Sequence, residues 1–125
     1  MRGLTIVNVL VNYMYMQQAN EQLDQVFFAL SDATRRAILA RLAEGSTTVG
    51  ALARPFNISA PAISRHMRVL EGAGLIKRSV KGREHYCTLS TAGLKTAEDW
   101  LNFHRDFWES RFDALGQLFR QVDPN

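Results

Sequence analysis

Apolar residues recur every three to four positions along most of the chain, which is the period of an amphipathic helix. Capping residues mark the boundaries, since Ser31 and Asp32 can accept the free amide hydrogens of one helix start and Ser59 those of another. Gly45 tolerates a left-handed helix end, and the residue before Pro55 avoids helical geometry. The pattern predicts helices at residues 20–30, 33–44, 48–54, 59–72 and 91–119.

Between the last two of these helices the pattern changes from helical to β-prone. Residues 75–80 and 84–89 are rich in strand-forming side chains and flank a turn at residues 81–83, which predicts a β-hairpin. We therefore expect a mainly α fold with a small β-hairpin wing. Two short helices joined by a tight turn and followed by a basic hairpin are typical of a winged helix-turn-helix protein.

The distribution of charge says more about partners than the total charge does. The chain of 125 residues, long enough for one domain, has a net charge of only +3. Between Arg54 and His85, however, the sequence has seven cationic and only two anionic side chains. This local excess of positive charge indicates either a DNA-facing surface or a solvated basic face. The single cysteine excludes an intrachain disulfide, and no segment is apolar enough to span a membrane. We expect a cytoplasmic protein without a membrane partner.

The helix predicted at residues 59–72 has two chemically distinct faces. Ile63, Met67 and Leu70 share one face and are expected in the core. The opposite face begins with small residues, which let a helix start approach base edges, and continues with Arg65 and Arg68, which can donate two hydrogen bonds to guanine. The alternative is a surface helix without a ligand. The expected contacts to double-stranded DNA, from this helix and from the hairpin tip, are Ser59, Ala60, Pro61, Ser64, Arg65, His66, Arg68, Lys81 and Arg83.

The last predicted helix is apolar over more than one face. A monomer of this size would struggle to cover both of its stripes, and aromatic stripes are typical interface anchors. We expect a homodimer that places two such DNA-reading helices about 34 Å apart on a palindromic operator. The alternative is that both stripes pack on the core of the same chain or form a ligand pocket. The expected dimerisation residues are Trp100, Phe103, His104, Phe107, Trp108, Phe112 and Leu115.

Three segments closely resemble the ArsR-type transcriptional regulators, namely residues 28–39 (FALSDATRRAIL), 59–76 (SAPAISRHMRVLEGAGLI) and 81–89 (KGREHYCTL). The resemblance covers about residues 20–120 and implies a homodimeric winged-helix repressor that acts at promoters, often on its own operon. Many family members sense metals through a cysteine pair in the helix before the turn, but residues 48–54 contain no cysteine. The resemblance therefore implies the DNA-binding role without the metal-sensing one.

No cofactor, metal site or catalytic site is expected. Cys87 is alone, and the histidines at positions 66, 85 and 104 lie in different predicted elements, whereas a metal site needs several converging ligands. We find no nucleophile with a base at a useful spacing and no phosphate-binding loop, so we exclude an enzyme. The alternative function is a metal- or small-ligand-responsive repressor with a site between the C-terminal helices. Cys87 itself is either a reactive thiol, its pKa lowered by nearby cations, or a half-buried strand residue.

The first nineteen residues stand apart from the rest. Their apolar run at residues 4–11 favours a strand or an ill-defined tail. Either translation starts at Met14 or Met16 and the extension is an annotation artefact, or it is a real arm that packs across a dimer. We divide the chain into an N-terminal extension at residues 1–19, a winged helix-turn-helix DNA-binding and dimerisation domain at 20–120, and a polar tail at 121–125.

Overall fold

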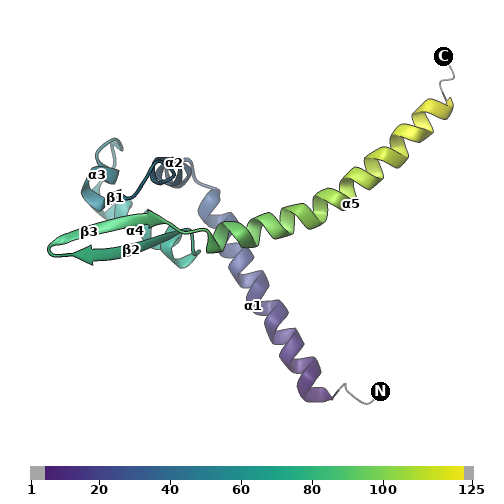
Figure 1. The fold of residues 1–125 in the computed structure, drawn as a ribbon, viewed down its shortest axis with the longest axis horizontal. Helices are drawn as coiled ribbons and strands as arrows, with labels where there is room; N and C mark the ends of the chain where they lie inside the picture. The colour runs from purple at the N-terminus through teal and green to yellow at the C-terminus, as the bar shows by residue number, and fades with distance from the viewer. Residues whose placement is uncertain (1–4, 123–125) are drawn as a thin grey trace.

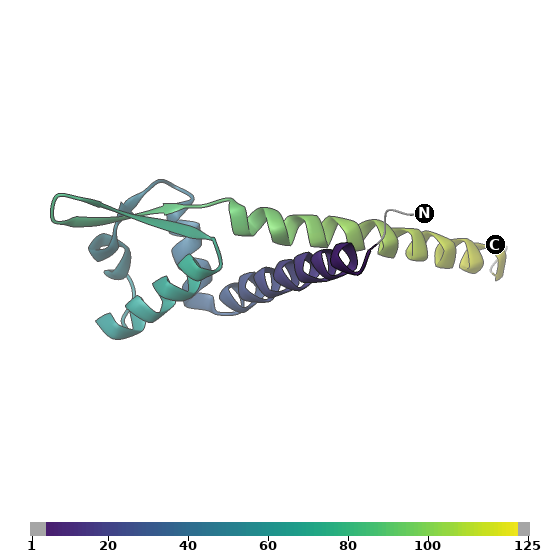
Figure 2. The same cartoon turned by 90° about the horizontal axis from the view of Figure 1, so that it is seen from below.

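The computed structural model of the protein describes residues 5–122. A head made of α2, α3, α4 and a small sheet lies at one end, and α1 and α5 project from it as two long arms (Figure 1). Seen from below, both arms leave the head on the same side (Figure 2). The elements are α1 (Ile6–Leu30), α2 (Ala33–Leu42), β1 (Thr47–Thr48), α3 (Val49–Ala53), α4 (Ala60–Gly72), β2 (Ile76–Lys81), β3 (Glu84–Leu89) and α5 (Ala92–Val122).

Side-chain caps start the head helices where the sequence predicts them. Asp32, Thr48 and Ser59 begin α2, α3 and α4, and each accepts the amide hydrogen of the residue three positions further on. Ser31 differs from the prediction, because it lies at the end of α1, where its hydroxyl donates to the carbonyl oxygen of Phe28 at 2.6 Å. One helix therefore ends and the next begins within two residues.

The predicted hairpin is part of a three-stranded antiparallel sheet with the order β1-β3-β2. Lys81 pairs with Glu84, so β2 and β3 are joined by two residues only, and the first of them, Gly82, has a φ of +63°. A glycine at the first position suits the turn that matches the twist of a hairpin. The sequence did not predict β1, because two residues are too few to show a periodicity.

Helix α1 begins at Ile6, so the strand or tail predicted for the apolar run at residues 4–11 and the helix start predicted at residue 20 are wrong within the described residues. Thr5 caps this helix by accepting the amide hydrogen of Asn8 at 3.2 Å. Once residues 20–30 are helical, each residue added at the N-terminus gains a backbone hydrogen bond at low entropic cost. This segment projects away from the small sheet (Figure 1), so the strand preference of its β-branched residues is overridden. Residues 1–4, which the prediction also covered, lie outside the described residues.

The last helix is also longer than predicted. It continues to Val122, so residues 121 and 122 of the predicted tail are helical, and residues 123–125 lie outside the described range. Helix α2 is two residues shorter than predicted and ends at Leu42, before Gly45, whose φ is +144°. Within residues 5–122 no helix combines the length and the apolar character that crossing a membrane requires.

The core lies where α1, α2, α3 and α4 meet beneath the sheet. Ile63, Met67 and Leu70 of α4 are at most 4% exposed, which confirms the predicted inner face of this helix. Because one face of α4 is buried, its opposite face is presented to solvent. The other buried apolar residues are Val26, Ala29, Ile38, Leu42, Leu52, Ala73, Leu75, Ile76, Cys87 and Ala97.

The start of α5 is in backbone contact with the turn that ends α4. The amide of Gly93 donates to the carbonyl oxygen of Gly74 at 2.9 Å, and Gly74 has a φ of +74°, which favours glycine. A Cβ atom on Gly93 would overlap the carbonyl oxygen of Ala73 and lie 3.1 Å from the carbonyl carbon of Gly74. These are backbone atoms, so only a movement of α5 relative to α4 could relieve the overlap.

Gly93→Ala is therefore expected to lower the free energy of unfolding by about 2 kcal/mol, the typical cost of overpacking. Urea unfolding at a fixed protein concentration measures this change. Gly50→Ala is the matched control, because nothing lies within 4 Å of a Cβ at this helical position, and it should be neutral or slightly stabilising. Equal stability of both variants would contradict the close approach of α5 to α4.

Candidate nucleic-acid interface

The exposed face of α4 carries most of the residues that the sequence predicts to contact DNA. Two features of this face suit a nucleic acid: its first turn has small side chains, and its middle is cationic. Its position opposite the buried face follows from the helical period alone. The predicted residues of this helix that the structure leaves exposed are Ser59, Ala60, Pro61, Ser64, Arg65 and Arg68.

The tip of the wing carries the other two predicted contacts. Lys81 and Arg83 are both exposed there, at the end of the hairpin that lies farthest from α5 (Figure 1). The ammonium group of Lys81 lies 5.4 Å from the ring centroid of Tyr86. The Tyr86 hydroxyl donates to Glu84 at 2.8 Å, and this hydrogen bond raises the pKa of Tyr86 above its usual value. The wing therefore holds its lysine on an aromatic surface while the ammonium group remains in water.

A second pair of side chains ties the wing to α4. The Nε atom of Arg78 on β2 lies 3.3 Å from Oε1 of Glu71, near the end of α4. Both side chains are partly exposed, so this ion pair contributes little to stability. It nevertheless gives Arg78 a partner within the protein, which neither Lys81 nor Arg83 has among acidic side chains of the described residues.

His66 does not lie with the other predicted DNA contacts. Its side chain is only 19% exposed and its Nδ1 atom lies 3.1 Å from Nη1 of Arg35 and 3.9 Å from Oδ2 of Asp32. The hydrogen bond from the amide of Arg35, and then the nearby charge of the Arg35 guanidinium group, lower the pKa of Asp32 below its usual value. The sequence could not indicate this arrangement, because 31 residues separate Arg35 from His66.

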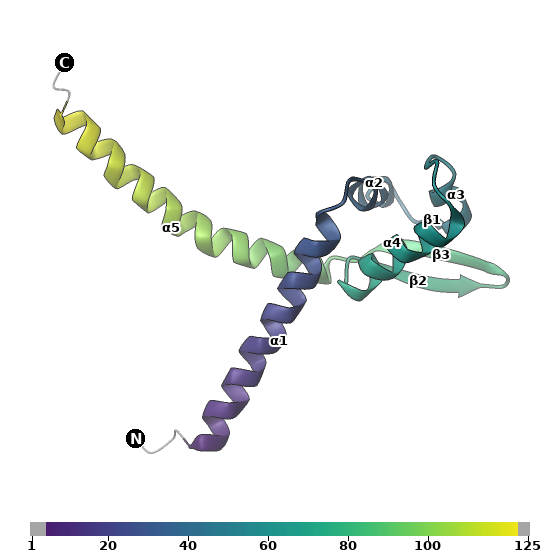
Figure 3. The ribbon, with the colours of Figure 1, turned by 180° about the vertical axis from the view of Figure 1, so that it is seen from behind.

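Helix α5 projects from the head as a long arm (Figure 3). Its aromatic residues are largely exposed. Trp100 packs edge-on against Phe27 of α1 with 5.7 Å between ring centroids, and His104 lies between Trp100 and Trp108. Beyond this contact the two arms diverge, and Phe103 is 73% exposed. All seven predicted dimerisation residues thus lie on one arm. All of them are exposed except His104, which is partly buried.

The first half of α1 is a second apolar surface, which the sequence interpretation did not list among the interface residues. Its apolar side chains are 44% to 79% exposed. No charged residue occurs between residues 5 and 20. The long apolar run could have indicated this surface, but the strand or tail that we expected for it was wrong. These residues are Ile6, Val7, Val9, Leu10, Val11, Tyr13, Met14, Tyr15 and Met16.

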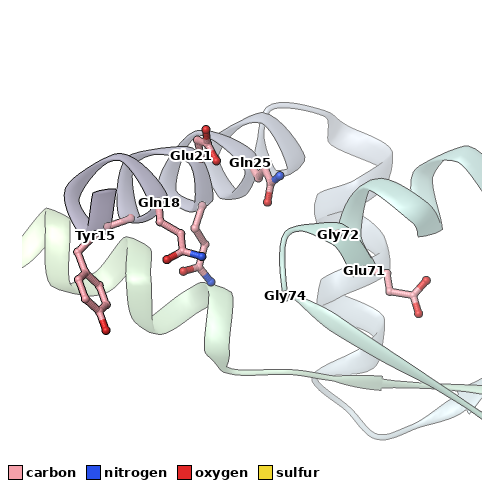
Figure 4. A pocket seen from close by; sticks show the side chains of 9 residues that line it. Tyr15, Gln18, Glu21, Gln25, Glu71, Gly72 and Gly74 are labelled. Carbon is pink, nitrogen blue, oxygen red and sulfur yellow. The ribbon is translucent and has the colours of Figure 1, made fainter. Parts of the chain in front are cut away.

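Several hollows lie beside α1, and they include two whose lining contains no predicted DNA contact. One has a volume of about 520 Å³ and separates Tyr15, Gln18 and Gln25 of α1 from Gly74 and the end of α4 (Figure 4). Its charged lining residues are two glutamates, which suits neither a phosphate nor a base. The other, of about 420 Å³, lies between α1 and α5 beside Trp100. Neither hollow is lined by Arg65 or Arg68.

The structure decides between the two alternatives for Cys87. This side chain is completely buried in the core, and burial is the main cause that raises the pKa of its thiol above the usual value. The prediction of a reactive thiol with a lowered pKa is therefore wrong. Within residues 5–122 no three histidine, cysteine or acidic side chains gather in a group that could hold a metal ion.

The fold and the exposed face of α4 define a winged helix-turn-helix DNA-binding protein. Residues 30–79 match the family model of a helix-turn-helix domain. The chain is 44% identical over 82 residues to the transcriptional repressor SdpR of Bacillus subtilis (strain 168), a match that covers 65% of this chain and 91% of that protein.

Solved structures extend this similarity to three dimensions. The crystal structure of an ArsR family transcriptional regulator, RHA00566, matches with a TM-score of 0.69 and 40% identity, over 73% of this chain and 94% of that one. The homodimeric winged helix-turn-helix domain of Mb0332 from Mycobacterium bovis has the same fold, with a TM-score of 0.55 and 21% identity over 91% of this chain and 95% of that one. The chain belongs to the ArsR-type winged helix-turn-helix transcriptional regulators.

Because Cys87 is fully buried, its thiol should react with a disulfide reagent at least roughly 100-fold more slowly in the folded protein than in the unfolded chain, since reaction requires local opening. The rate of thionitrobenzoate release in buffer and in 8 M urea measures the difference. The rate of glutathione under the same two conditions corrects for the effect of urea on the reagent. A similar corrected rate in both states would show that the thiol is accessible.

Proposed function

We propose that this protein is a homodimeric repressor that acts in the cytoplasm, binds a palindromic DNA operator and has no metal effector. The observation that carries this proposal is the exposed face of α4, where Arg65 and Arg68 follow a small, polar helix start and lie opposite a fully buried face. A helix with this arrangement fits the major groove, where arginine recognises guanine through two hydrogen bonds.

The other contacts follow from the same placement. The Ser59 hydroxyl and the amide of Ala60 at the start of α4 can hold a phosphate, because a backbone N–H group and the helix dipole both favour an anion there. Lys81 and Arg83 at the wing tip reach the phosphate backbone or the adjacent minor groove. In this proposal α4 supplies sequence preference and the wing supplies affinity.

A repressor without a metal effector is supported by two facts. The matched relative SdpR is described as a transcriptional repressor. Helix α3, at residues 49–53, has no cysteine, and the chain's single thiol is buried in the core. We propose the same repressing role here, through occupation of a promoter.

The homodimer is supported by the apolar arms. From Trp100 onward every large apolar residue of α5 that the structure describes is at least 37% exposed. The apolar side chains in the first half of α1 are likewise exposed. So many exposed apolar side chains along two helices are rare on a monomer and are typical of an interface. The related domain of Mb0332 is described as homodimeric. We propose that α5 forms the interface and that α1, as a real arm, packs across it.

The proposal predicts that the protein selects a palindromic sequence from a randomised library of duplexes. Arg65→Ala should reduce the preference for the selected duplex over a scrambled one by at least about tenfold, because a bidentate guanine contact is lost. Lys81→Ala should weaken both duplexes alike and reduce the salt slope of binding by about one unit per protomer. Fluorescence anisotropy at several salt concentrations measures both effects.

Lys95→Ala is the matched control for Lys81→Ala, since Lys95 is 69% exposed on α5 and pairs with Asp99. Its affinity for both duplexes should stay unchanged. Selection of no preferred sequence would refute the repressor, and equal losses from both DNA-facing variants would refute the division of roles. Release of the selected duplex by micromolar zinc, cadmium or arsenite would refute the absence of a metal effector.

Phe112→Glu is expected to weaken dimerisation at least about 100-fold, because a two-fold axis places the new carboxylate in the interface twice. Sedimentation equilibrium measures the dissociation constant. Val80→Glu is the matched control, since Val80 is 61% exposed on the wing and Phe112 is 70% exposed. If both variants remain dimers, α5 is not the interface.

Leu10→Glu tests the arm in the same experiment. If α1 packs across the dimer, this variant should weaken dimerisation as well, because Leu10 is a 54% exposed apolar residue of the first half of α1. A dimer as tight as that of the unmodified protein would contradict a role for the N-terminal extension.

A further inference from the structure

Arg35 joins three elements at one buried point. It is 7% exposed, its Nε and Nη2 atoms donate to the carbonyl oxygens of Ala29 and Phe28 at 2.8 Å each, and its Nη1 atom lies 3.1 Å from Nδ1 of His66. The guanidinium group also lies 5.0 Å from the ring centroid of Phe28. The guanidinium group of Arg35, at the start of α2, thus contacts both the end of α1 and the middle of α4.

The direction of the contact to α4 follows from chemistry. An arginine only donates, so Nδ1 of His66 accepts the hydrogen bond and its proton lies on Nε2 in the neutral ring. Asp32, with Oδ2 at 3.9 Å from the same Nδ1 atom, is the only acidic group near the ring in the described part of the chain. The geometry therefore selects one tautomer of His66.

This contact restrains a motion that the apolar packing of α4 restrains poorly. Apolar packing is non-directional, so the inner face of α4 permits small rolls of the helix about its axis. A roll of about 15° moves an atom at the outer radius of a helix, about 6 Å from the axis, by about 1.5 Å. Binding groups must hold their productive geometry to within about 0.5 Å.

We propose that Arg35 is a positioning residue for DNA recognition, which sets the roll of α4 through its hydrogen bond to His66 and thereby aims Arg65 and Arg68. Arg65 is the direct neighbour of His66, so a change in the roll moves both side chains together. A second side-chain contact from α4 to a different element, between Glu71 and Arg78, lies near the C-terminal end of the helix and is partly exposed. This inference rests on the proposed DNA-binding function.

Arg36 offers a matched control one residue away. Its Nη1 atom donates to the carbonyl oxygen of Leu30 at 2.8 Å, at the same end of α1, and the residue is exposed. Arg35→Lys and Arg36→Lys make the same chemical change, keep the charge and remove a guanidinium fork from the end of α1. Only the first removes the contact to α4.

The test measures anisotropy with the duplex selected by the unmodified protein and with a scrambled duplex. Arg35→Lys and His66→Leu should each bind the selected duplex about tenfold more weakly, a loss equivalent to about 1.4 kcal/mol, with an unchanged salt slope. Arg36→Lys should bind normally. His66→Asn should also bind within about threefold of the unmodified protein, because the Asn oxygen replaces Nδ1 as acceptor. Circular dichroism melts and sedimentation verify that each variant is folded and dimeric.

Three results would overturn the inference. Arg35→Lys binding as well as Arg36→Lys would exclude positioning. His66→Asn binding as weakly as His66→Leu would indicate that the ring contacts DNA directly. A His66 ring protonated on Nδ1 in long-range ¹⁵N spectra of the unmodified protein at pH 8 would exclude the hydrogen bond, and this measurement needs no variant to fold. Failure of the unmodified protein to select any duplex would instead refute the proposed function.

Discussion

The burial of one face of α4 is the constraint on which the rest of the DNA-binding head depends. Ile63, Met67 and Leu70 are at most 4% exposed, and burial of such side chains contributes about 1.5–3 kcal/mol each. Because a helix repeats every 3.6 residues, burying these three positions obliges Arg65 and Arg68 to face solvent. Helices α1 and α2 and strand β2 supply the surfaces against which α4 packs.

The arms and the head are mechanically connected where α5 starts. Gly93 and Gly74 bring the backbone of α5 against the turn that ends α4, and the absence of a Cβ atom at Gly93 permits this approach. A rearrangement of the arms would therefore act on the end of α4 through backbone contact. The Arg35–His66 contact joins α2 to the middle of α4. Both α5 and α2 can therefore influence the orientation of α4.

Local signals predicted the head well because each depends on few residues. Asp32, Thr48 and Ser59 cap helices where the sequence places them, and Gly82 turns the wing. The strand β1 was missed because its two residues pair with β3 only after the chain folds back. The first half of α1 was assigned the wrong conformation, because the strand preference of its β-branched residues depends on packing in a sheet, and this segment projects away from the one present (Figure 1).

The sequence by itself determined the class of protein, the two faces of α4, the wing and the aromatic character of the last helix. These features follow from spacing along one element, which the sequence states directly. Only the tertiary structure decided that α1 is a long apolar arm, that Cys87 is buried and that His66 turns inward to Arg35. Each of these depends on residues distant in sequence becoming neighbours, and no local period reports which distant residue will arrive.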